Sequence, residues 1–409
     1  MPPQAAIRRS RLVERAPDEA ACPHANLCLL VTTRTMEPST DPADRKPSAD
    51  TAHREIPARH PFAAFGGWLA RVDPGTHRRI KGLRLVTAYG LASALGTLQD
   101  VTHGLPRDAS VGLLAANFAL WASVSEARTT RPESSRDLAL LCAAAALGAA
   151  MYVCVAQPLR FFGHAGPELV LVTGAFLVGY LKRFGVTGGG LGSQIYIGQL
   201  LAYGANLVPA DLPAIAIAGL IAMLASIVPR LLSGPAERPA VVAALSPGPE
   251  PVAGRPSPEF VMGLQAASGA LVVVALNAWL NLAESAWAIT ACTYVVAGSA
   301  TGTVQRVRRR IIGTLVGVPL GLICLPIAEH APLLIWLAAA LAMIVYSMAL
   351  PERYDIPCGA FAFTLIVTLA VNGIHSIPFL TARAWETLIG GVLGLLAAMV
   401  IFPLRSRGR

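Results

Sequence analysis

The sequence predicts an all-α, polytopic integral membrane protein, and three observations lead to this fold class. Hydrophobic residues make up 54% of the 409 residues and charged residues only 14%, whereas a soluble domain usually carries about 25% charged residues. A chain of this composition cannot cover a core with a polar surface, which excludes a soluble globular enzyme. The apolar residues also form long runs, and most Lys and Arg residues stand between them.

The N-terminal region, residues 1–80, is rich in Pro, Arg, Asp and Ala and has little periodicity. This composition predicts a disordered cytoplasmic segment. Within it, residues 61–72 place Phe62, Phe65 and Trp68 on roughly one helical face. These residues form either a short interfacial helix or an irregular linker, and the sequence leaves both interpretations open.

Twelve apolar runs follow, most of them close to the roughly 17–25 residues that a membrane-spanning helix needs. The fourth run is the shortest and the weakest prediction. The runs cover residues 82–98, 109–125, 137–156, 167–181, 188–207, 212–232, 259–282, 286–304, 311–328, 332–350, 356–373 and 384–403.

The twelve runs divide into two membrane halves of six helices each, residues 81–232 and 259–405. The Pro/Gly-rich stretch between them, residues 233–258, reads as a cytoplasmic linker. The third run of each half begins near a basic residue, Arg136 or Arg310. These features predict two parallel six-helix repeats, an arrangement typical of transporters whose substrate path lies at the repeat interface.

The positions of Lys and Arg predict the orientation in the membrane. If the N-terminus is cytoplasmic, the inner loops and helix ends after residue 81 carry 17 basic residues and the outer loops carry three. Cytoplasmic loops hold the excess of Lys and Arg in membrane proteins, so both termini are predicted to be cytoplasmic. The net charge of +9 is therefore a topology signal and gives no reason to expect a nucleic-acid partner.

Motifs of enzymes and of ATP-driven pumps are missing from the sequence. It has no GxxxxGK[ST], HExxH, GxSxG or CxxC, which are the patterns for phosphate loops, zinc proteases, serine hydrolases and thiol metal sites. We therefore expect neither catalysis nor a cofactor or metal.

The last run offers the clearest candidates for a substrate or proton path. Arg383 and Glu386 are three residues apart, so they share a helical face at its outer end, close to Thr387. An ionisable residue inside a span costs about 2.5–3.5 kcal/mol on insertion scales, which suggests a function. Glu386 could carry a proton and Arg383 could attract a carboxylate; the alternative is an ion pair at the helix end.

A second group of candidates lies near the ends of three other runs. Asn277, Asn281 and Glu284 lie toward the outer end of the seventh run and are expected to face the bundle interior, either bonding between helices or lining the path. Arg310 and Arg84 lie at inner ends, where they either anchor the orientation or attract an anion.

The second half also carries a set of motifs in a recognisable order. They are RxxGTxxG from Arg310 to Gly317, the turn from Leu350 to Tyr354, and RxxxTxxG from Arg383 to Gly390. This part resembles the fusaric acid resistance (FUSC-like) or aromatic acid exporter family, best over about 280–405 and only faintly over 82–232. Unlike larger members, the chain has no large cytoplasmic domain after each half.

The resemblance implies a secondary transporter that exports aromatic or related organic acids across the inner (plasma) membrane, driven by the proton gradient. Its partners would be the organic acid, the lipid bilayer and, if the export route continues outward, a periplasmic adaptor protein. Two alternatives stay open: a passive organic-anion channel and a non-transport membrane scaffold. A major facilitator fits less well, because the loop at 125–137 lacks the Gly-x-x-x-Asp-Arg signature.

Overall fold

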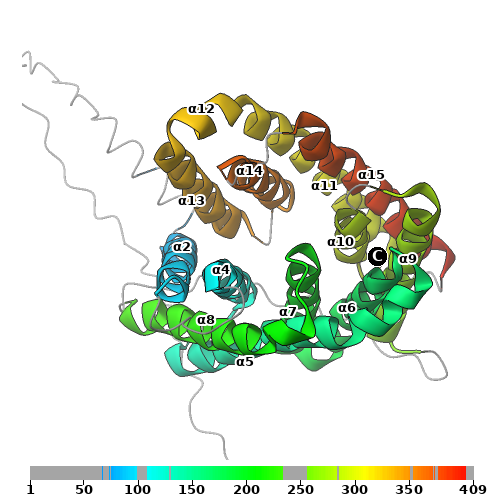
Figure 1. Cartoon of the computed structure of the whole chain (residues 1–409), viewed down its shortest axis with the longest axis horizontal. Coiled ribbons are helices and arrows are strands. Elements are labelled where there is room, and N and C mark those ends of the chain that lie inside the picture. Colours follow the sequence, from blue (N-terminus) through cyan, green and yellow to red (C-terminus); the bar gives the residue numbers. More distant parts are fainter. Residues whose placement is uncertain are drawn as a thin grey trace, which may run out of the picture. The chain divides into compact units, whose positions relative to one another are not determined.

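The computed structural model is built from helices, and the part of the chain that it describes contains no β-strand (Figure 1). All described elements belong to one compact unit, residues 59–409. The structure describes Gly67, Asp73, Gly373 and residues 75–98, 108–128, 130–233, 256–282, 285–350, 353–371 and 376–401. The predicted interfacial segment at 61–72, apart from Gly67, and nearly all of the predicted linker at 233–258 lie outside these residues.

The helices follow one another with short connections. The first half contains α2 (His77–Gly96), α4 (Asp108–Ser125), α5 (Arg131–Leu159), α6 (Leu169–Tyr180), α7 (Gly185–Gly204) and α8 (Leu212–Leu232). The second half contains α9 (Pro258–Leu280), α10 (Ser285–Val295), α11 (Ala300–Ile323), α12 (Leu325–His330), α13 (Pro332–Ala349), α14 (Asp355–Val371) and α15 (Ile377–Val400).

Each of the twelve predicted runs overlaps a helix, which confirms the all-helical prediction. Among the described residues, six helical segments are long and apolar enough to cross a membrane. They are Arg131–Phe162, Gly166–Gly204, Pro209–Leu232, Pro258–Leu280, Pro332–Ala349 and Leu380–Val400, with Val111–Ser125 and Asp355–Val371 as shorter apolar helices. The chain is thus a multi-pass membrane protein, while the count of twelve spans stays a prediction.

The boundary between α10 and α11 differs from the prediction of one run over 286–304. Helix α10 ends at Val295, and α11 starts at Ala300 because the Ser299 side chain caps it by accepting a hydrogen bond from the Gly302 amide at 3.1 Å. The polar stretch 305–310 then continues as helix, so α11 begins 11 residues before the apolar run that predicted it.

The packing of the helices follows the same order in the two halves. Helix α5 packs on α7 and α8, and α11 packs on α14 and α15. Helix α4 packs on α2 and α8, and α10 packs on α9 and α15. The halves meet where α6 packs on α9 and where α13 packs on α2. In Figure 1, α4, α7, α10 and α14 lie nearest the middle of the unit.

Glycines allow very close contacts between some of these helices. A Cβ at Gly317 of α11 would lie 2.2 Å from the carbonyl oxygen of Gly359 on α14. A Cβ at Gly148 of α5 would lie 2.1 Å from the carbonyl oxygen of Ile195 on α7. Neither distance is possible for a real side chain, so these helix pairs depend on glycine.

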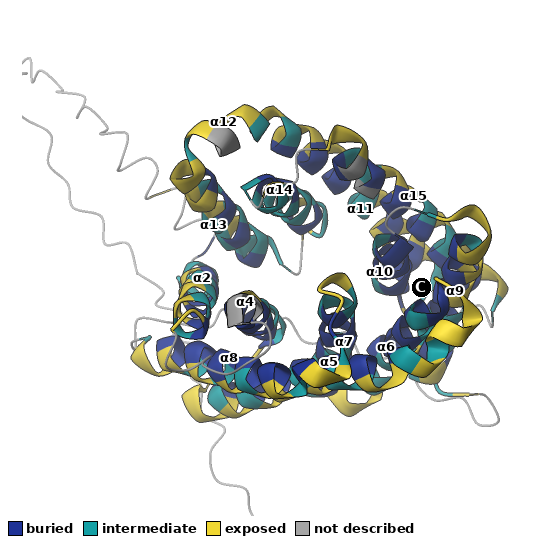
Figure 2. Cartoon of the chain, in the orientation of Figure 1, coloured by how far each residue is buried: buried dark blue, intermediate teal, exposed yellow. Residues whose placement is uncertain are grey.

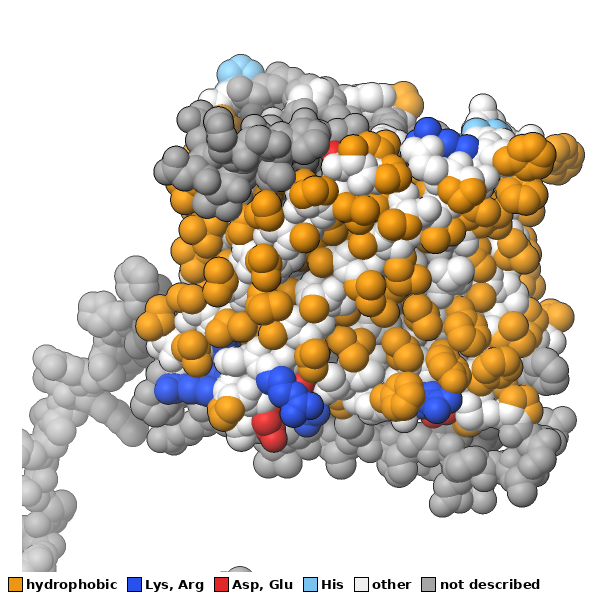
Figure 3. All heavy atoms as spheres, turned by 60° about the horizontal axis from the view of Figure 1, so that its bottom comes forward, with side chains coloured by type: hydrophobic (Ala, Val, Ile, Leu, Met, Phe, Trp, Pro, Cys, Tyr) orange, Lys and Arg blue, Asp and Glu red, His pale blue; other side chains and the backbone are white. Residues whose placement is uncertain are grey.

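The outward surface is apolar, as a lipid-facing surface must be. Large side chains such as Leu220, Leu224 and Leu341 are each at least 60% exposed. Figure 2 shows exposed residues on the outer faces of the helices and buried residues where helices face one another. On the face drawn in Figure 3, hydrophobic side chains fill the middle and the charged ones gather toward the margins.

Candidate functional site

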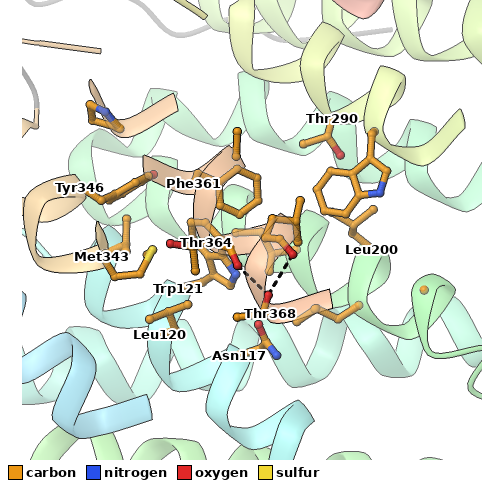
Figure 4. A pocket seen from close by; sticks show the side chains of 18 of the residues that line it. Asn117, Leu120, Trp121, Leu200, Thr290, Met343, Tyr346, Phe361, Thr364 and Thr368 are labelled. Carbon is orange, nitrogen blue, oxygen red and sulfur yellow. Dashed lines mark hydrogen bonds between the residues drawn. The ribbon is translucent and has the colours of Figure 1, made fainter. Parts of the chain in front are cut away.

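A cavity of about 670 Å³ lies between the inner helices of the unit. Residues of α2, α4, α7, α10, α11, α13, α14 and α15 line it, so both membrane halves contribute to its wall. Cavities of about 300–1,000 Å³ hold small-molecule ligands in proteins. The cavity is therefore the candidate substrate site, and Figure 4 shows a part of its lining.

Aromatic rings form one wall of the cavity. The Trp121 ring of α4 meets the Phe361 ring of α14 edge-on, with ring centroids 5.4 Å apart, and meets the Tyr346 ring of α13 at 6.2 Å. The ring centroids of Trp287 of α10 and Phe361 are 6.1 Å apart. These four rings come from four helices and line the same cavity, and Figure 4 labels three of them, Trp121, Tyr346 and Phe361. Such a wall offers several faces and edges on which a flat aromatic ligand can stack.

One cation lines the cavity, Arg310 of α11. Its guanidinium donates a hydrogen bond to the Tyr354 hydroxyl at 3.4 Å, while its buried Nε has no hydrogen-bond partner. Among the described residues, no carboxylate forms an ion pair with Arg310. Arg310 is half-buried. A cation that is partly removed from water without a counter-charge is costly, and an anionic ligand in the cavity would supply the missing partner. Below, Arg310 and Tyr354 are called the Arg310 cluster.

Neutral hydroxyl groups join α7 to α10 beside the cavity. The hydroxyls of Ser193 and Tyr294, which both line it, lie 2.6 Å apart. The hydroxyls of Tyr196 and Thr290 lie 2.8 Å apart in the same interface. These bonds connect helices of the two halves without using a charge.

A second polar cluster surrounds the buried carboxylate of Glu168, which precedes α6. Its Oε1 accepts hydrogen bonds from the Tyr203 hydroxyl at 2.7 Å, from Asn277 Nδ2 at 2.8 Å and from the Ser285 hydroxyl. Tyr203 also lines the cavity, whereas Glu168 does not, so Tyr203 connects the carboxylate to the cavity wall. Glu168, Tyr203, Asn277 and Ser285 are called the Glu168 cluster below.

The structure places the sequence candidates in different surroundings. Arg310 and Thr387 line the cavity, whereas Glu386 is fully buried on α15 and is not part of the lining. Arg84 is buried on α2, also outside the lining. The Arg383 side chain lies outside the described part of the chain, as does Glu284.

The two asparagine candidates lie in different surroundings. Asn277 is buried and bonds to Glu168, as expected of a residue that faces the bundle interior. Asn281 is exposed and was wrongly expected to share that face. Asn281 is the C-cap of α9 and adopts the left-handed conformation, with a φ of 53°. Its backbone amide still donates to the carbonyl oxygen of Asn277, but the residue has left the helical conformation and is exposed.

The sequence reasoning missed Glu168, Tyr203 and the aromatic wall around Trp121. A signal existed for Glu168, since it is an acidic residue at the edge of the run 167–181. Its three donors come from positions 203, 277 and 285, and nothing in the linear sequence connects them. No group of His, Cys, Asp and Glu side chains suited to a metal ion occurs among the described residues.

The comparisons with known proteins bear on the second half of the chain. A family model described as fusaric acid resistance protein-like matches residues 270–397. This confirms the resemblance inferred from the motifs around Arg310 and Arg383, and it points to membrane transport. Searches of the curated proteins and of the solved structures found no significant match to the chain.

Proposed function

We propose that the protein is a secondary transporter that exports aromatic or related organic acids across the inner membrane, with the proton gradient as driving force. The observation that carries this proposal is Arg310, a cation without a carboxylate partner in a cavity walled by aromatic rings. A guanidinium pairs with a carboxylate through two parallel hydrogen bonds. An aromatic acid has both parts that such a cavity can bind.

The cavity fits an aromatic acid better than an aliphatic one of equal charge. Trp121, Phe361 and Trp287 offer stacking and edge contacts, each worth about 0.5–1.5 kcal/mol beyond the area that it buries. An aliphatic acid would keep the contact with Arg310 and lose these ring contacts.

The matching order of helix contacts supports two parallel six-helix repeats. In both halves the third helix packs on the fifth and the sixth, and the second packs on the first and the sixth. Six helices per repeat would leave both termini on the cytoplasmic side, in agreement with the distribution of Lys and Arg. The substrate path then runs through the cavity, at the interface of the repeats.

Among the sequence candidates, Glu386 is retained as a proton carrier within this proposal. It is fully buried and directly precedes Thr387, which lines the cavity. Replacing Glu386 by Gln removes the titrating group at nearly constant size, and proton-dependent efflux is then expected to be lost. Unchanged transport in vesicles would remove Glu386 from the mechanism.

Transport into inverted membrane vesicles that contain the full-length protein in their membrane tests the proposed function. Uptake of benzoate, of cyclohexanecarboxylate and of uncharged benzamide is measured with and without a proton gradient. We expect benzoate to be preferred over both, and the gradient to drive its accumulation. Fluxes that follow the anion gradient and ignore the proton gradient would identify a passive channel, and absence of any flux would favour a scaffold.

Arg310→Met, with Arg308→Met as its matched control, tests whether the cavity carries the transport. Arg308 is an exposed arginine on the same helix that does not line the cavity. A hydrogen bond to a charged group contributes about 1.5–3 kcal/mol, so Arg310→Met is expected to weaken benzoate binding by about tenfold or more. Equal affinities of the two variants would contradict the proposal.

A further inference from the structure

The Glu168 carboxylate lies in an enclosed site. Glu168 is 1% exposed, and its Oε1 accepts three hydrogen bonds from three different helices. Tyr203 comes from α7, Asn277 from α9 and Ser285 from the first residue of α10. The carboxylate therefore holds together helices of the two membrane halves.

The other oxygen of the same carboxylate has no such partner. Glu168 Oε2 is buried and forms no hydrogen bond in the structure. Within the described ranges, no Lys, Arg or His side chain forms an ion pair with Glu168. The buried Oε2 therefore keeps a lone pair to which a proton can bind.

The titratable and charged groups near the cluster come from α5, from α7 and from the segment before α6. Tyr152 of α5 packs edge-on against Tyr203, with ring centroids 6.0 Å apart. His164 is exposed and bonds to the carbonyl oxygen of Asn277 at 3.1 Å, and Arg160 is exposed. From α9 and α10, the groups that bond to the carboxylate are the uncharged side chains of Asn277 and Ser285.

We infer that Glu168 is a protonation site that couples export to the proton gradient; this rests on the proposed transport function. In the coupling step a proton binds a lone pair of Oε2 to form the neutral acid, and it later leaves to water on the other side of the membrane. No bond between heavy atoms is made or broken, and no further reactant is needed.

Protonation changes the contact between the halves. A neutral carboxyl group is a weaker acceptor than a carboxylate, so its bonds to Asn277 and Ser285 weaken when the proton binds. Tyr203 reports the same change to the cavity, because its ring lines the cavity while its hydroxyl bonds to Oε1. Protonation of Glu168 thus affects both the contact between the two halves and the cavity that binds the substrate.

Infrared titration of the purified full-length protein, without substrate, tests the protonation site by itself. We expect a carbonyl band of buried protonated carboxyl groups that grows as the pH falls, and we expect Glu168→Gln to lose the part of this band that Glu168 contributes. The control Glu133→Gln removes an exposed carboxylate and should leave the band unchanged. A wild-type spectrum identical to that of Glu168→Gln at every pH would overturn the inference.

Transport in the same vesicles tests the coupling. Glu168→Gln is expected to bind benzoate within about twofold of wild type and to exchange labelled for unlabelled benzoate, yet to lose accumulation driven by the proton gradient. Tyr203→Phe keeps the acid and removes one donor, so the pH of half-maximal transport should rise by up to about one unit. A merely structural role would leave that pH in place.

The outcomes separate this inference from the proposed function. Gradient-driven accumulation by Glu168→Gln at the wild-type level would overturn the coupling role and leave the binding site at Arg310 intact. If the wild-type protein does not bind benzoate, the proposed function is contradicted. The infrared band would still decide whether Glu168 titrates.

Discussion

The Arg310 cluster and the Glu168 cluster each contain one ionisable side chain, half-buried at Arg310 and buried at Glu168, and the two side chains differ in their contact with the cavity. Arg310 lines the cavity and its Nε has no partner, so the cation is available to a ligand. Glu168 is not part of the cavity lining, but it bonds to Tyr203, which is. Its Oε1 accepts hydrogen bonds from three donors of the protein. Arg310 is therefore placed to bind an anion in the cavity, whereas the Glu168 carboxylate has no direct contact with that anion.

The close contact of α11 with α14 should be the most sensitive support of the Arg310 cluster. A Cβ at Gly317 would clash with the carbonyl oxygen of Gly359, so Gly317→Ala must push α14, and with it Tyr354, away from α11. We expect a loss of about 3 kcal/mol or more, measured as thermal stability in detergent. Gly90→Ala on α2 is the control, because a Cβ there meets open space; equal effects of both changes would break the argument.

Arg310→Lys sharpens the comparison, since it keeps the charge of the cluster and removes the planar fork. We expect benzoate affinity between those of wild type and Arg310→Met, because an ammonium group cannot form two parallel bonds with a carboxylate. Isothermal titration with benzoate measures the order. An affinity of the Lys variant equal to that of wild type would show that charge alone is recognised.

Trp121→Ala should reduce selectivity more than it reduces overall anion binding. Removing the ring abolishes the contact with Phe361, and a ring pair is worth about 0.5–1.5 kcal/mol, so benzoate binding should weaken by roughly two- to tenfold. Binding of cyclohexanecarboxylate should change less. If both acids lose affinity equally, the wall provides only volume.

Arg128→Ala should have the smallest effect on both clusters. The Nε of the exposed Arg128 donates to the buried carboxylate of Asp137 at 2.9 Å, and this hydrogen bond raises the pKa of Arg128. Without Arg128, the Thr187 hydroxyl still donates to Asp137, and an ion pair with an exposed partner contributes little to stability, so benzoate binding, proton coupling and melting temperature should stay close to wild type. A large loss of transport would mean that this pair takes part in the cycle.

The helical architecture could be predicted from the sequence because apolar runs and Pro/Gly stretches are local signals. The boundary at Ser299 was missed, since the polar residues from Gln305 to Arg310 interrupt hydrophobicity without interrupting the helix. Of the candidate site, Arg310 and Thr387 could be placed from motifs. The Glu168 cluster could not, because its members are up to 117 positions apart and only tertiary packing brings them together.

The hydroxyl bridges between α7 and α10 have a consequence for the behaviour of the protein in salt. The Ser193–Tyr294 and Tyr196–Thr290 bonds involve neutral groups, and dissolved ions screen charges rather than neutral hydrogen bonds. The contact between α7 and α10 should therefore keep its strength at ionic strengths that weaken an ion pair with an exposed partner, such as Arg128–Asp137. Salt should act on how fast an anion reaches the cavity, and leave the wall that encloses it unchanged.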